Sequence, residues 1–403
     1  MAHAGPARRL RILLYAQHLS GVGHYVRTLE IARALGVCHD VRLIEGGRPV
    51  PRSRPPGVAF VPVPRIARGP RGLVSLDGDP DTAEVLNRRR AQLRALGEDL
   101  CPDVVVVEHY PFSKWELEGE ILGMIEAARR VRSDVRVVCS VRDILPQTRH
   151  EDCPADVYAA KVIDRLHASF DALMVHGDPS LTRLEDHFPR ASDIRIPVEY
   201  TGIVSETLAP QTDAEQSVPR LTGGTPFVLA SAGGGADPQD LLGTCVDAWH
   251  LLEGAGVLPG WRLVVFGGLG WPADARDALA RRAAMPSVVM RPFSSDFLHW
   301  VHAAGLSISC AGYNTCANLL EARCRAVLVP NPAMSDQQFR ARALRARGIA
   351  EVIEPGTLSA ERLAKAVRDR LAAPLPDYAI ALDGAARSRA FMERLAGWAG
   401  SAS

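Results

Sequence analysis

The 403-residue sequence has no excess of charge, very little lysine and no long apolar segment. Its 47 basic and 46 acidic residues give a formal charge of +1. This balance argues against a dedicated nucleic-acid binder, because such proteins need excess positive charge to face phosphates. Lys114, Lys161 and Lys365 are the only lysines, a bias toward arginine that we attribute to genome composition.

Segments that would insert into a membrane are also lacking. No apolar run approaches the roughly 18 residues needed to span a bilayer. The first apolar run, 12–16, is shorter than the core of a signal peptide and leads into Gln17 and His18. The sequence therefore predicts a cytoplasmic protein without a transmembrane segment.

Cysteine spacings typical of metal sites are absent as well. The sequence has eight cysteines, none of them in a C-x-x-C pair, and several lie inside apolar runs. This usage is typical of buried thiols in a reducing cytosol. The cysteines therefore give no sign of a metal site. We expect neither a protein-bound metal nor a cofactor.

What the sequence does have is a regular alternation of strand-like and helical segments, over a length that suits two or about three domains. Segments 104–107 and 135–141 are nearly continuous β-branched runs, which are typical of strands covered on both faces. The alternation stops in a polar stretch, 211–225, and restarts at Phe227. The sequence therefore predicts an α/β protein with two doubly wound parallel sheets.

The pattern also gives the expected boundaries. We expect an N-terminal domain at 1–206, a linker at 207–224, a C-terminal domain at 225–375 and a crossing helix within 376–403. The expected strands of the first domain lie at 11–15, 41–44, 103–107, 135–141 and 172–175. Those of the second lie at 227–230, 262–266, 288–290, 306–308 and 326–329, and helices are expected at 25–35, 316–323 and 379–398.

The first predicted strand ends in a glycine turn that carries a histidine, Ser20-Gly-Val-Gly-His24. As a dinucleotide fingerprint the turn is weak, because Val26 replaces the next glycine. Ligands of doubly wound sheets bind beyond the carboxyl ends of the strands, and a helix N-terminus lowers the pKa of a histidine. His24 is therefore a candidate general base. The alternative is a capping or packing histidine.

A second glycine turn, Ser231-Ala-Gly-Gly-Gly235, follows the first strand of the second domain. Three glycines let backbone N–H groups approach a phosphate closely, whereas a merely tight turn needs one. We interpret this turn as part of a phosphate site.

The third turn runs from Ser309 to Thr315 and opens a predicted helix. Gly312 relieves the turn, and Asn314 and Thr315 are expected to cap the helix, so that its N-terminus forms an anion site. Further on, Gln337 and Gln338 begin another helix. Their amides suit sugar hydroxyls because each both donates and accepts; solvated first-turn residues are the alternative.

These motifs resemble the family 28 glycosyltransferases, which include the enzyme that adds N-acetylglucosamine to the peptidoglycan lipid precursor. The stretches that carry the resemblance are Gly312-Tyr-Asn-Thr-x-Ala-Asn-Leu-Leu-Glu, Ala-Val-Leu-Val-Pro330 and Asp336-Gln-Gln-x-Arg-Ala-x-Ala-Leu. Segments 21–27, 141–144, 176–179 and 200–202 look like a bacterial branch of predicted glycosyltransferases. The resemblance covers the chain from about Arg11 to Leu371.

The resemblance implies the GT-B fold, with two Rossmann-like domains facing a central cleft and a C-terminal helix that returns to the first domain. The acceptor would bind the first domain and the nucleotide-sugar donor the second. No metal would be needed, because helix dipoles and backbone amides stabilise the departing diphosphate. The implied donor site comprises the Phe293 backbone at the uracil, Ser231, Gly233, Gly234, Gly312, Asn314 and Thr315 at the diphosphate, and Gln337 and Gln338 at the sugar.

One position departs from the family pattern. The family usually has a glutamate where Asn318 stands, and that carboxylate accepts hydrogen bonds from both ribose hydroxyls. An amide offers one acceptor and one donor without charge assistance. Glu321, one helical turn on, is a candidate substitute, and a solvated residue is the alternative. The departure leaves donor affinity and donor identity open.

By the same resemblance, His24 matches a histidine near the transferred sugar, which in an inverting mechanism takes the proton from the acceptor hydroxyl. Related enzymes orient this histidine with a carboxylate of the same domain. Glu108, at the end of one predicted strand, and Asp143, just past the next, are the candidates. A structural cap, or a pair with Arg142, is the alternative for each.

Two further segments bear on the acceptor. Segment 46–73 has six arginines and no acid, which suits either a lid for an anionic acceptor or membrane surface, or an ordinary solvated loop; we favour the loop. Segment 109–112 and Trp115 are aromatic and suit sugar rings, with core packing as the default.

The sequence thus predicts transfer of N-acetylglucosamine or a related hexosamine from a nucleoside diphosphate, UDP by resemblance, to an acceptor hydroxyl or amine. The acceptor would be a small molecule or a glycolipid of natural-product or glycoconjugate biosynthesis, and the lack of an apolar lip beside His24 favours a soluble one. A sugar-nucleotide 2-epimerase of the same fold and a non-catalytic sugar-nucleotide binder are the alternatives. A nicotinamide-dependent reductase is disfavoured by Val26 and by the doubled architecture.

Overall fold

The computed structural model describes residues 8–19, 21, 23–145, 154–208, 218–233, 240–268 and 270–398. The chain divides into two compact units, Met1–Val204 with Asp383–Ser403, and Ser205–Leu382. Part of the expected linker, 209–217, lies outside the described residues, and the part at Val218–Thr222 is a helix, α5, that packs against α8 of the second unit. Segment 376–382 stays with the second unit, where the Tyr378 hydroxyl donates to the Leu320 carbonyl at 2.6 Å.

The first unit is built on a seven-stranded parallel sheet in the order β3-β2-β1-β6-β7-β8-β9. An antiparallel hairpin, β4-β5, follows β3 in the sequence. The strands are β1 (Arg11–Tyr15), β2 (Asp40–Glu45), β3 (Val58–Pro62), β4 (Ile66–Gly69), β5 (Gly72–Ser75), β6 (Val104–Glu108), β7 (Arg136–Arg142), β8 (Ala172–His176) and β9 (Val198–Tyr200). The helices are α1 (Gly23–Gly36), α2 (Thr82–Leu100), α3 (Glu118–Val131), α4 (Ala155–Ser169) and α12 (Gly384–Leu395).

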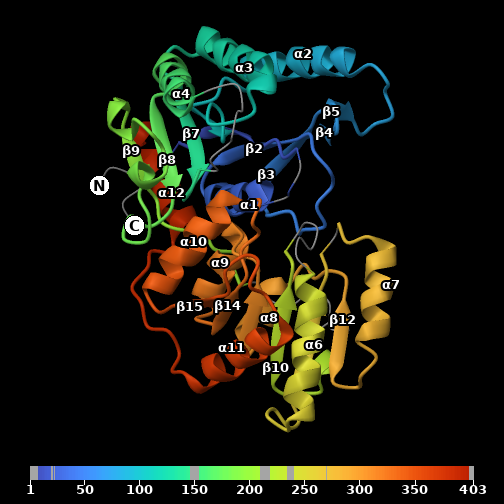
Figure 1. The fold of residues 1–403 in the computed structure, drawn as a ribbon. Helices are drawn as coiled ribbons and strands as arrows, with labels where there is room; N and C mark the ends of the chain where they lie inside the picture. Colours follow the sequence, from blue (N-terminus) through green and yellow to red (C-terminus); the bar gives the residue numbers. More distant parts are fainter. Residues whose placement is uncertain are drawn as a thin grey trace, which may run out of the picture. The chain divides into compact units, whose positions relative to one another are not determined.

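Helices cover both faces of this sheet, as Figure 1 shows for α2, α3 and α4 on one side and α1 on the other. Side chains of a strand alternate between the faces, so Leu13 and Val105 pack into the core under α2, α3 and α4. Their neighbours Ile12 and Val104 pack instead with α1 and α12. This double burial explains the β-branched runs of the sequence.

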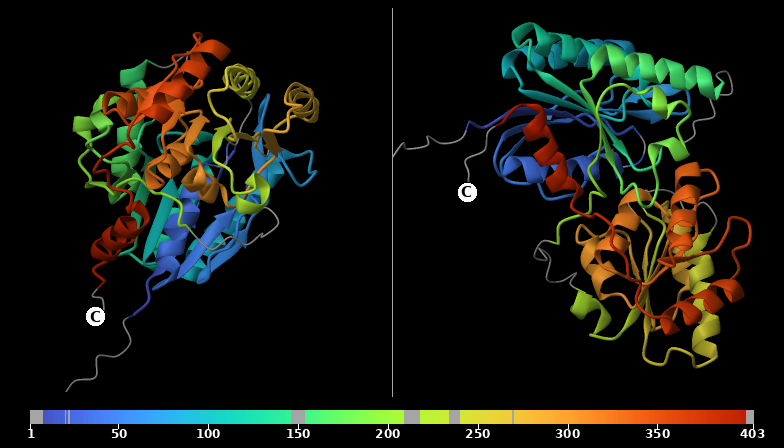
Figure 2. Two further views of the ribbon diagram at one scale, coloured as in Figure 1. Left: turned by 90° about the horizontal axis from the view of Figure 1, so that it is seen from below. Right: turned by 90° about the vertical axis from the view of Figure 1, so that its left-hand side faces the viewer.

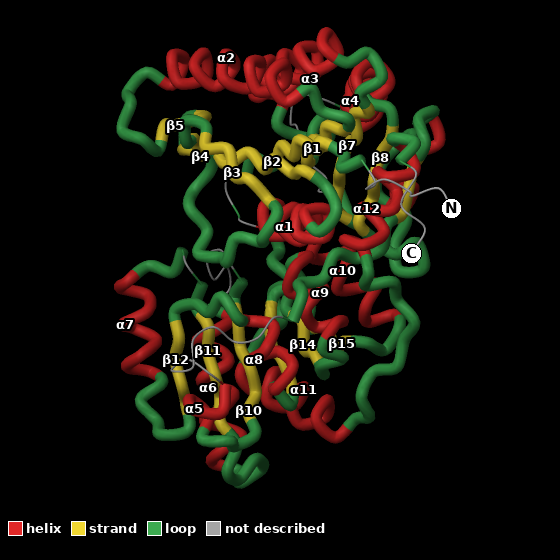
Figure 3. Tube along the Cα trace, turned by 180° about the vertical axis from the view of Figure 1, so that it is seen from behind, coloured by secondary structure: helices red, strands yellow, loops and turns green. Residues whose placement is uncertain are grey.

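The second unit has a six-stranded sheet in the order β12-β11-β10-β13-β14-β15, again wholly parallel. Helices α6 and α11 pack on one face, and Trp300 of α8 contacts Phe227 and Phe266 on the other. Figure 3 shows β12, β11 and β10 side by side in this sheet. The strands are β10 (Phe227–Ser231), β11 (Arg262–Phe266), β12 (Val288–Arg291), β13 (Leu306–Ser309), β14 (Ala326–Leu328) and β15 (Ala350–Val352). The remaining helices are α6 (Leu241–Gly254), α7 (Ala273–Arg282), α8 (Phe297–Ala303), α9 (Tyr313–Glu321), α10 (Ser335–Ala346) and α11 (Ala360–Ala372).

The predicted fold class is confirmed, and so is the return of the final helix to the first unit. Helix α12 packs on α1 (Figure 2), and Glu393 bonds to Nε2 of the buried His39 at 2.9 Å. The expected helix at 379–398 was too long, because α12 begins only at Gly384, which packs closely against the backbone of residues 202 and 203. The prediction that segment 46–73 is a loop was also wrong in part, since the segment contains β3 and most of the β4-β5 hairpin.

None of the described helices is long and apolar enough to cross a membrane. Five of the cysteines that the structure describes are buried, as their apolar surroundings predicted.

A buried ion pair ties α2 and α3 to the end of β1. The Arg89 guanidinium donates to both carboxylate oxygens of Glu120, at 2.9 and 2.6 Å, and both side chains are almost fully excluded from solvent. Tyr15 donates to the same carboxylate at 2.5 Å, and the side-chain oxygen of Gln17 accepts from Arg89 at 3.0 Å. The removal of one partner leaves an uncompensated buried charge, which costs far more than the intact pair contributes.

We therefore expect Arg89→Met to lower the free energy of unfolding of the first unit by about 3–5 kcal/mol, because Glu120 loses its countercharge. The exposed neighbour Arg90, changed to Met, is the matched control and should cost no more than about 0.5 kcal/mol. Urea unfolding followed by circular dichroism measures both. Equal effects of the two substitutions would contradict the role assigned to this pair.

Candidate active site

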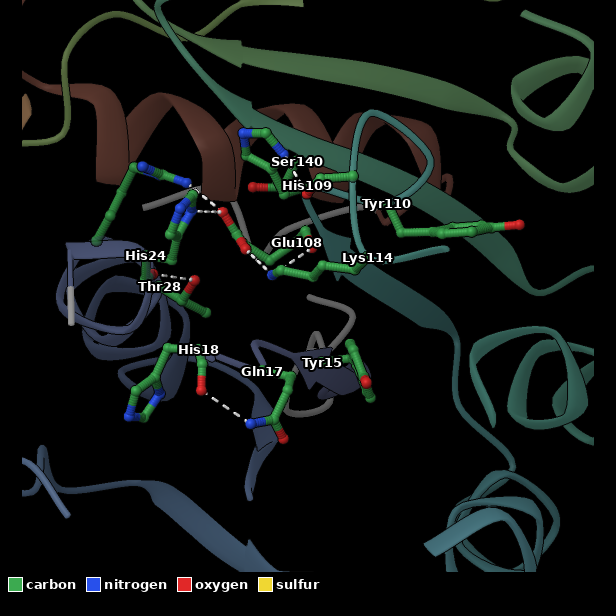
Figure 4. Close-up of polar contacts among 12 residues, drawn as sticks. Tyr15, Gln17, His18, His24, Thr28, Glu108, His109, Tyr110, Lys114 and Ser140 are labelled. Atoms are coloured by element: carbon green, nitrogen blue, oxygen red, sulfur yellow. Dashed lines mark hydrogen bonds and ion pairs between the residues drawn. The ribbon is translucent and has the colours of Figure 1, made fainter. Parts of the chain in front are cut away.

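The candidate active site of the first unit lies where the order of its sheet reverses, between β1 and β6. Ligands of open α/β sheets bind at this point, beyond the carboxyl ends of the strands. Helix α1 follows β1 and carries His24 in its first turn, while Glu108 is the last residue of β6. The two side chains meet, with His24 Nδ1 2.5 Å from Glu108 Oε1 (Figure 4). The structure thus brings together two of the predicted catalytic residues.

Glu108 also binds two cationic side chains that sequence analysis missed. Arg27 Nη2 donates to Oε1 at 2.5 Å, and Lys114 Nζ donates to Oε2 at 2.5 Å and to the Glu108 carbonyl at 3.0 Å. Two signals were present in the sequence. Arg27 lies three residues after His24, on the same face of α1, and Lys114 is one of three lysines in the chain.

These neighbours decide the charges of the site. Burial by itself would raise the pKa of Glu108, but His24, Lys114 and Arg27 together hold it well below its usual range. Burial lowers the pKa of His24 from 6.5 to about 4, against the opposing effect of the Glu108 carboxylate. At neutral pH the site therefore contains an ionised carboxylate and a neutral imidazole.

The hydrogen bond to Glu108 also fixes the tautomer of His24. Because an ionised carboxylate only accepts, Nδ1 of His24 carries the proton and Nε2 keeps its lone pair. Nε2 has no partner among the described residues, and a quarter of the side chain, 26%, is exposed. The imidazole is therefore oriented and unprotonated at the nitrogen that can accept a proton from a ligand.

A second histidine packs edge-on against the first. The rings of His24 and His109 lie 4.9 Å apart at 90°, and Ser113 bonds to Nδ1 of His109 at 2.9 Å. His109 Nε2 is buried and has no hydrogen-bond partner in the part of the chain that the structure describes. His109 and Lys114 both adopt left-handed backbone conformations, with φ of 67° and 66°. Such conformations are uncommon for residues other than glycine and concentrate at functional sites.

The other predicted carboxylate, Asp143, is engaged differently. It is buried, and its carboxylate accepts from the Ile144 N–H at 2.8 Å while its carbonyl accepts from His187 Nε2 at 3.0 Å. These bonds fit the structural cap that the sequence left as an alternative. The aromatic segment 109–112 packs in the core, which was the default expectation, since Tyr110 and Phe112 are buried there.

The second unit has its own reversal of strand order, between β10 and β13. Ser231 ends β10 and lies opposite Ser309, which ends β13. Both hydroxyls are buried and have no partner among the described residues. Ser231 was predicted at the diphosphate, whereas Ser309 was named as the start of the third turn without a role in binding; its place at the end of the neighbouring strand was the available signal.

Two of the predicted glycine turns directly follow β10 and β13. Gly233 has a φ of +80°, which a residue with a side chain rarely adopts, and Gly234 lies outside the described residues. The prediction that Asn314 and Thr315 cap α9 was wrong. The N-cap is Gly312, without a side-chain bond, and the other two lie inside the first turn. Neither of the two predicted side chains therefore caps the N-terminus of α9.

Asn318 carries the departure from the family pattern, and it is buried. Its Nδ2 donates to Glu206 Oε1 at 3.1 Å, while its Oδ1 has no partner in the described chain. The carboxylate beside it is therefore Glu206, from the segment before α5, which sequence analysis did not find. No nearby motif signals this residue, because the contact joins positions 112 residues apart. The candidate substitute Glu321 is half-buried at the end of α9.

The two glutamines lie in the first turn of α10 and hold the loop before it. Gln337 Oε1 accepts from the Asn331 N–H at 3.0 Å, and Gln338 Nε2 donates to the Pro332 carbonyl at 2.8 Å. Each amide keeps its other polar atom without a partner among the described residues. Phe293 is half-buried just past the end of β12, at the same edge of the sheet.

No cluster of three or more potential metal ligands occurs in the described ranges.

Comparison with known proteins finds a known domain in the later part of the chain, over part of the second unit and most of α12. Residues 267–392 match the sequence model of the glycosyltransferase family 28 C-terminal domain. No curated protein matches the chain by sequence.

Solved structures of glycosyltransferases share the fold over nearly the whole chain. The kitacinnamycin glycosyltransferase is 18% identical with a TM-score of 0.61, covering 96% of this chain and 99% of that one. VinC in complex with dTDP is 15% identical with a TM-score of 0.58, covering 96% and 100%. MurG of Acinetobacter baumannii is 15% identical with a TM-score of 0.50, covering 96% and 98%. The chain is therefore a glycosyltransferase with the GT-B fold that carries a family 28 C-terminal domain.

Proposed function

We propose that the protein transfers a sugar from a nucleoside diphosphate to an acceptor hydroxyl or amine by inverting, metal-independent displacement, with His24 as general base. The observation that carries the proposal is the 2.5 Å bond between His24 and the buried Glu108 at the reversal point of the first sheet. Glu108 is a positioning residue, because it holds the imidazole through Nδ1 and leaves Nε2 for the acceptor.

In the transfer step the acceptor oxygen attacks the anomeric carbon while His24 Nε2 takes its proton. The bond between that carbon and the β-phosphate oxygen breaks, and the nucleoside diphosphate leaves with the bonding electrons. The imidazolium formed is stabilised by Glu108, whose negative charge lies one hydrogen bond away. A neutral, oriented base is what this step requires, and the low pKa of His24 supplies the neutral form throughout the physiological range.

The leaving diphosphate would bind at the reversal point of the second sheet. The hydroxyls of Ser231 and Ser309 are buried donors without a partner among the described residues. Fixed donors of this kind stabilise developing negative charge without reorganising. Gln337 and Gln338 offer one amide N–H group and one amide oxygen to the donor sugar.

For the donor we propose UDP-N-acetylglucosamine or a related hexosamine, with dTDP-sugars as the competing class. The resemblance of the sequence supports the first, and the dTDP complex of VinC supports the second. For the acceptor we propose a small natural product, because proteins of the same fold include the glycosyltransferase of kitacinnamycin and the calicheamicin glycosyltransferase CalG4.

The donor site is tested by titration with UDP, dTDP, GDP, ADP and NAD, measured as shifts in melting temperature. We expect one nucleoside diphosphate to stabilise the protein selectively. Ser309→Ala should weaken that binding about tenfold, the value of one hydrogen bond to a charged group. Ser307, two residues earlier on the same strand and also buried with an unpartnered hydroxyl, is the matched control and should leave binding unchanged when replaced by Ala. Stabilisation by NAD alone would overturn the donor assignment.

The base is tested by transfer activity, with donor sugars supplied to a panel of hydroxyl and amine acceptors and products detected by mass spectrometry. His24→Ala should lower kcat by about 10²–10⁴-fold, the usual contribution of a general base, with nucleotide binding intact. The exposed His167, at the end of α4, gives a control substitution to Ala that should retain activity. Full activity of His24→Ala would exclude it as the base, and conversion of the donor sugar without any acceptor would indicate an epimerase instead.

The charge state of His24 is tested by NMR titration of its ring, assigned by comparison with His24→Gln. We expect a midpoint near pH 4 in place of 6.5. Since the unfolded chain binds this proton near pH 6.5 and the folded chain only near pH 4, the first unit should lose stability as the pH falls between these values. Glu108→Gln removes the charge that favours the imidazolium, so the midpoint should fall further. A midpoint at or above 6.5 would contradict the neutral base.

A further inference from the structure

A cavity of about 210 Å³ opens in the first unit beyond the carboxyl ends of β1, β2 and β3. Its wall combines the segment between β1 and α1, the end of β2 with the loop that follows it, and the loop between β3 and β4. No residue of this cavity takes part in the transfer step derived above. Its position is nonetheless the edge at which open α/β sheets bind ligands.

Two buried rings form the base of the cavity. His18 and Tyr25 are 5% and 6% exposed, and their ring centroids lie 5.3 Å apart. The Arg48 carbonyl bonds to His18 Nε2 at 2.8 Å, and Gly47 lies so close that an added Cβ would be 2.4 Å from the imidazole. Only glycine fits there, so the loop after β2 is fixed against the ring. The cavity therefore has a preformed aromatic surface.

The charges around this surface are unbalanced. Four arginines line the cavity, at 48, 52, 54 and 65, against one acid, Glu45. Glu45 is already engaged, because Tyr25 donates to one of its oxygens at 2.5 Å and Arg54 to the other at 2.7 Å. Arg65 pairs with Asp77 at 2.6 Å. The Arg48 guanidinium has no hydrogen-bond or ion-pair partner in the described chain, so the cavity keeps an excess of positive charge.

We propose that this cavity binds an anionic group of the acceptor, a carboxylate or a phosphate ester on a planar or ring-shaped body. The identification of the ligand as the acceptor rests on the proposed function, whereas the binding of an anion in this cavity does not. The guanidinium of Arg48 would pair with the anion, since its planar fork matches both oxyanions, and the rings of His18 and Tyr25 would contact the body. Tyr25 directly follows His24 in α1, which places the cavity beside the turn that carries the base.

The proposed anion site gives a role to an arginine-rich segment whose role the sequence left open. The arginine-rich segment 46–73 suited either a lid for an anionic acceptor or a solvated loop, and the structure fixes part of it as the wall of a cavity. The ends of the segment differ in this respect. Arg48 lines the cavity, whereas Arg71 lies exposed in the turn between β4 and β5 and does not.

The test is isothermal titration of the full chain with benzoate and with benzamide, which have nearly the same shape and differ in charge. We expect benzoate to bind and benzamide to bind at least tenfold more weakly. Arg48→Gln should weaken benzoate binding about tenfold, as expected for one charge-assisted pair. Arg71→Gln, from the same arginine-rich segment, is the matched control and should bind benzoate as the unaltered chain does. Equal binding of the two probes, no binding of either, or equal losses in the two variants would overturn the proposal.

Competition with inorganic phosphate distinguishes the two anions. Displacement of benzoate by phosphate supports a phosphate ester as the natural group, and its failure supports a carboxylate. The outcome is separate from that of the nucleotide titration. Nucleotide binding without benzoate binding overturns the cavity assignment alone, whereas benzoate binding without any nucleotide binding overturns the transferase proposal and leaves the anion site in place.

Discussion

The first unit is organised around a carboxylate that has been removed from water. Glu108 is 1% exposed, and such a charge is tolerated inside a protein only when paired and hydrogen-bonded. Three side chains meet this demand, Arg27 and His24 from α1 and Lys114 from the loop after β6. The same contacts that make the buried charge acceptable also orient the imidazole. Helix position, loop conformation and the protonation state of His24 therefore depend on one residue at the end of one strand.

The two sheets place different chemical groups at equivalent positions, the points where their strand order reverses. Each is parallel, each reverses its order once, and each gathers polar groups at that reversal. In the first unit the central group, Glu108, is charged and is bonded by three side chains, which suits the holding of a base in one tautomer. In the second unit Ser231 and Ser309 are neutral, and their hydroxyls have no partner among the described residues. Donors left unpaired in this way suit a ligand that brings its own negative charge.

Buried polar atoms without partners proved more informative than polarity alone. Asn318 and Gln337 are both helical amides, yet Asn318 is buried with an oxygen that has no partner among the described residues, whereas Gln337 fixes the loop before its helix. The sequence shows the residue types and cannot distinguish these states. The bond from Asn318 to Glu206 changes the meaning of the departure from the family pattern, because an amide with a carboxylate beside it is not equivalent to an isolated amide.

The sequence alone predicted ten strands, their parallel arrangement, the glycine turns and the position of His24, because periodicity and turn chemistry are local properties of the chain. It missed the edge strands β3, β9 and β15 and the β4-β5 hairpin. The sequence also brought Glu108 and Asp143 forward as candidates, since both lie at predicted strand ends. The tertiary structure was needed to show that Glu108 contacts His24 and that Arg27, Lys114, Ser309 and Glu206 are neighbours of the two sites. The physical reason is that the contacts of Arg27, Ser309 and Glu206 join segments far apart in the sequence, whereas Lys114 reaches Glu108 through the conformation of one loop. The electrostatic environment that fixes a pKa or an ion pair exists only after the sheets have formed.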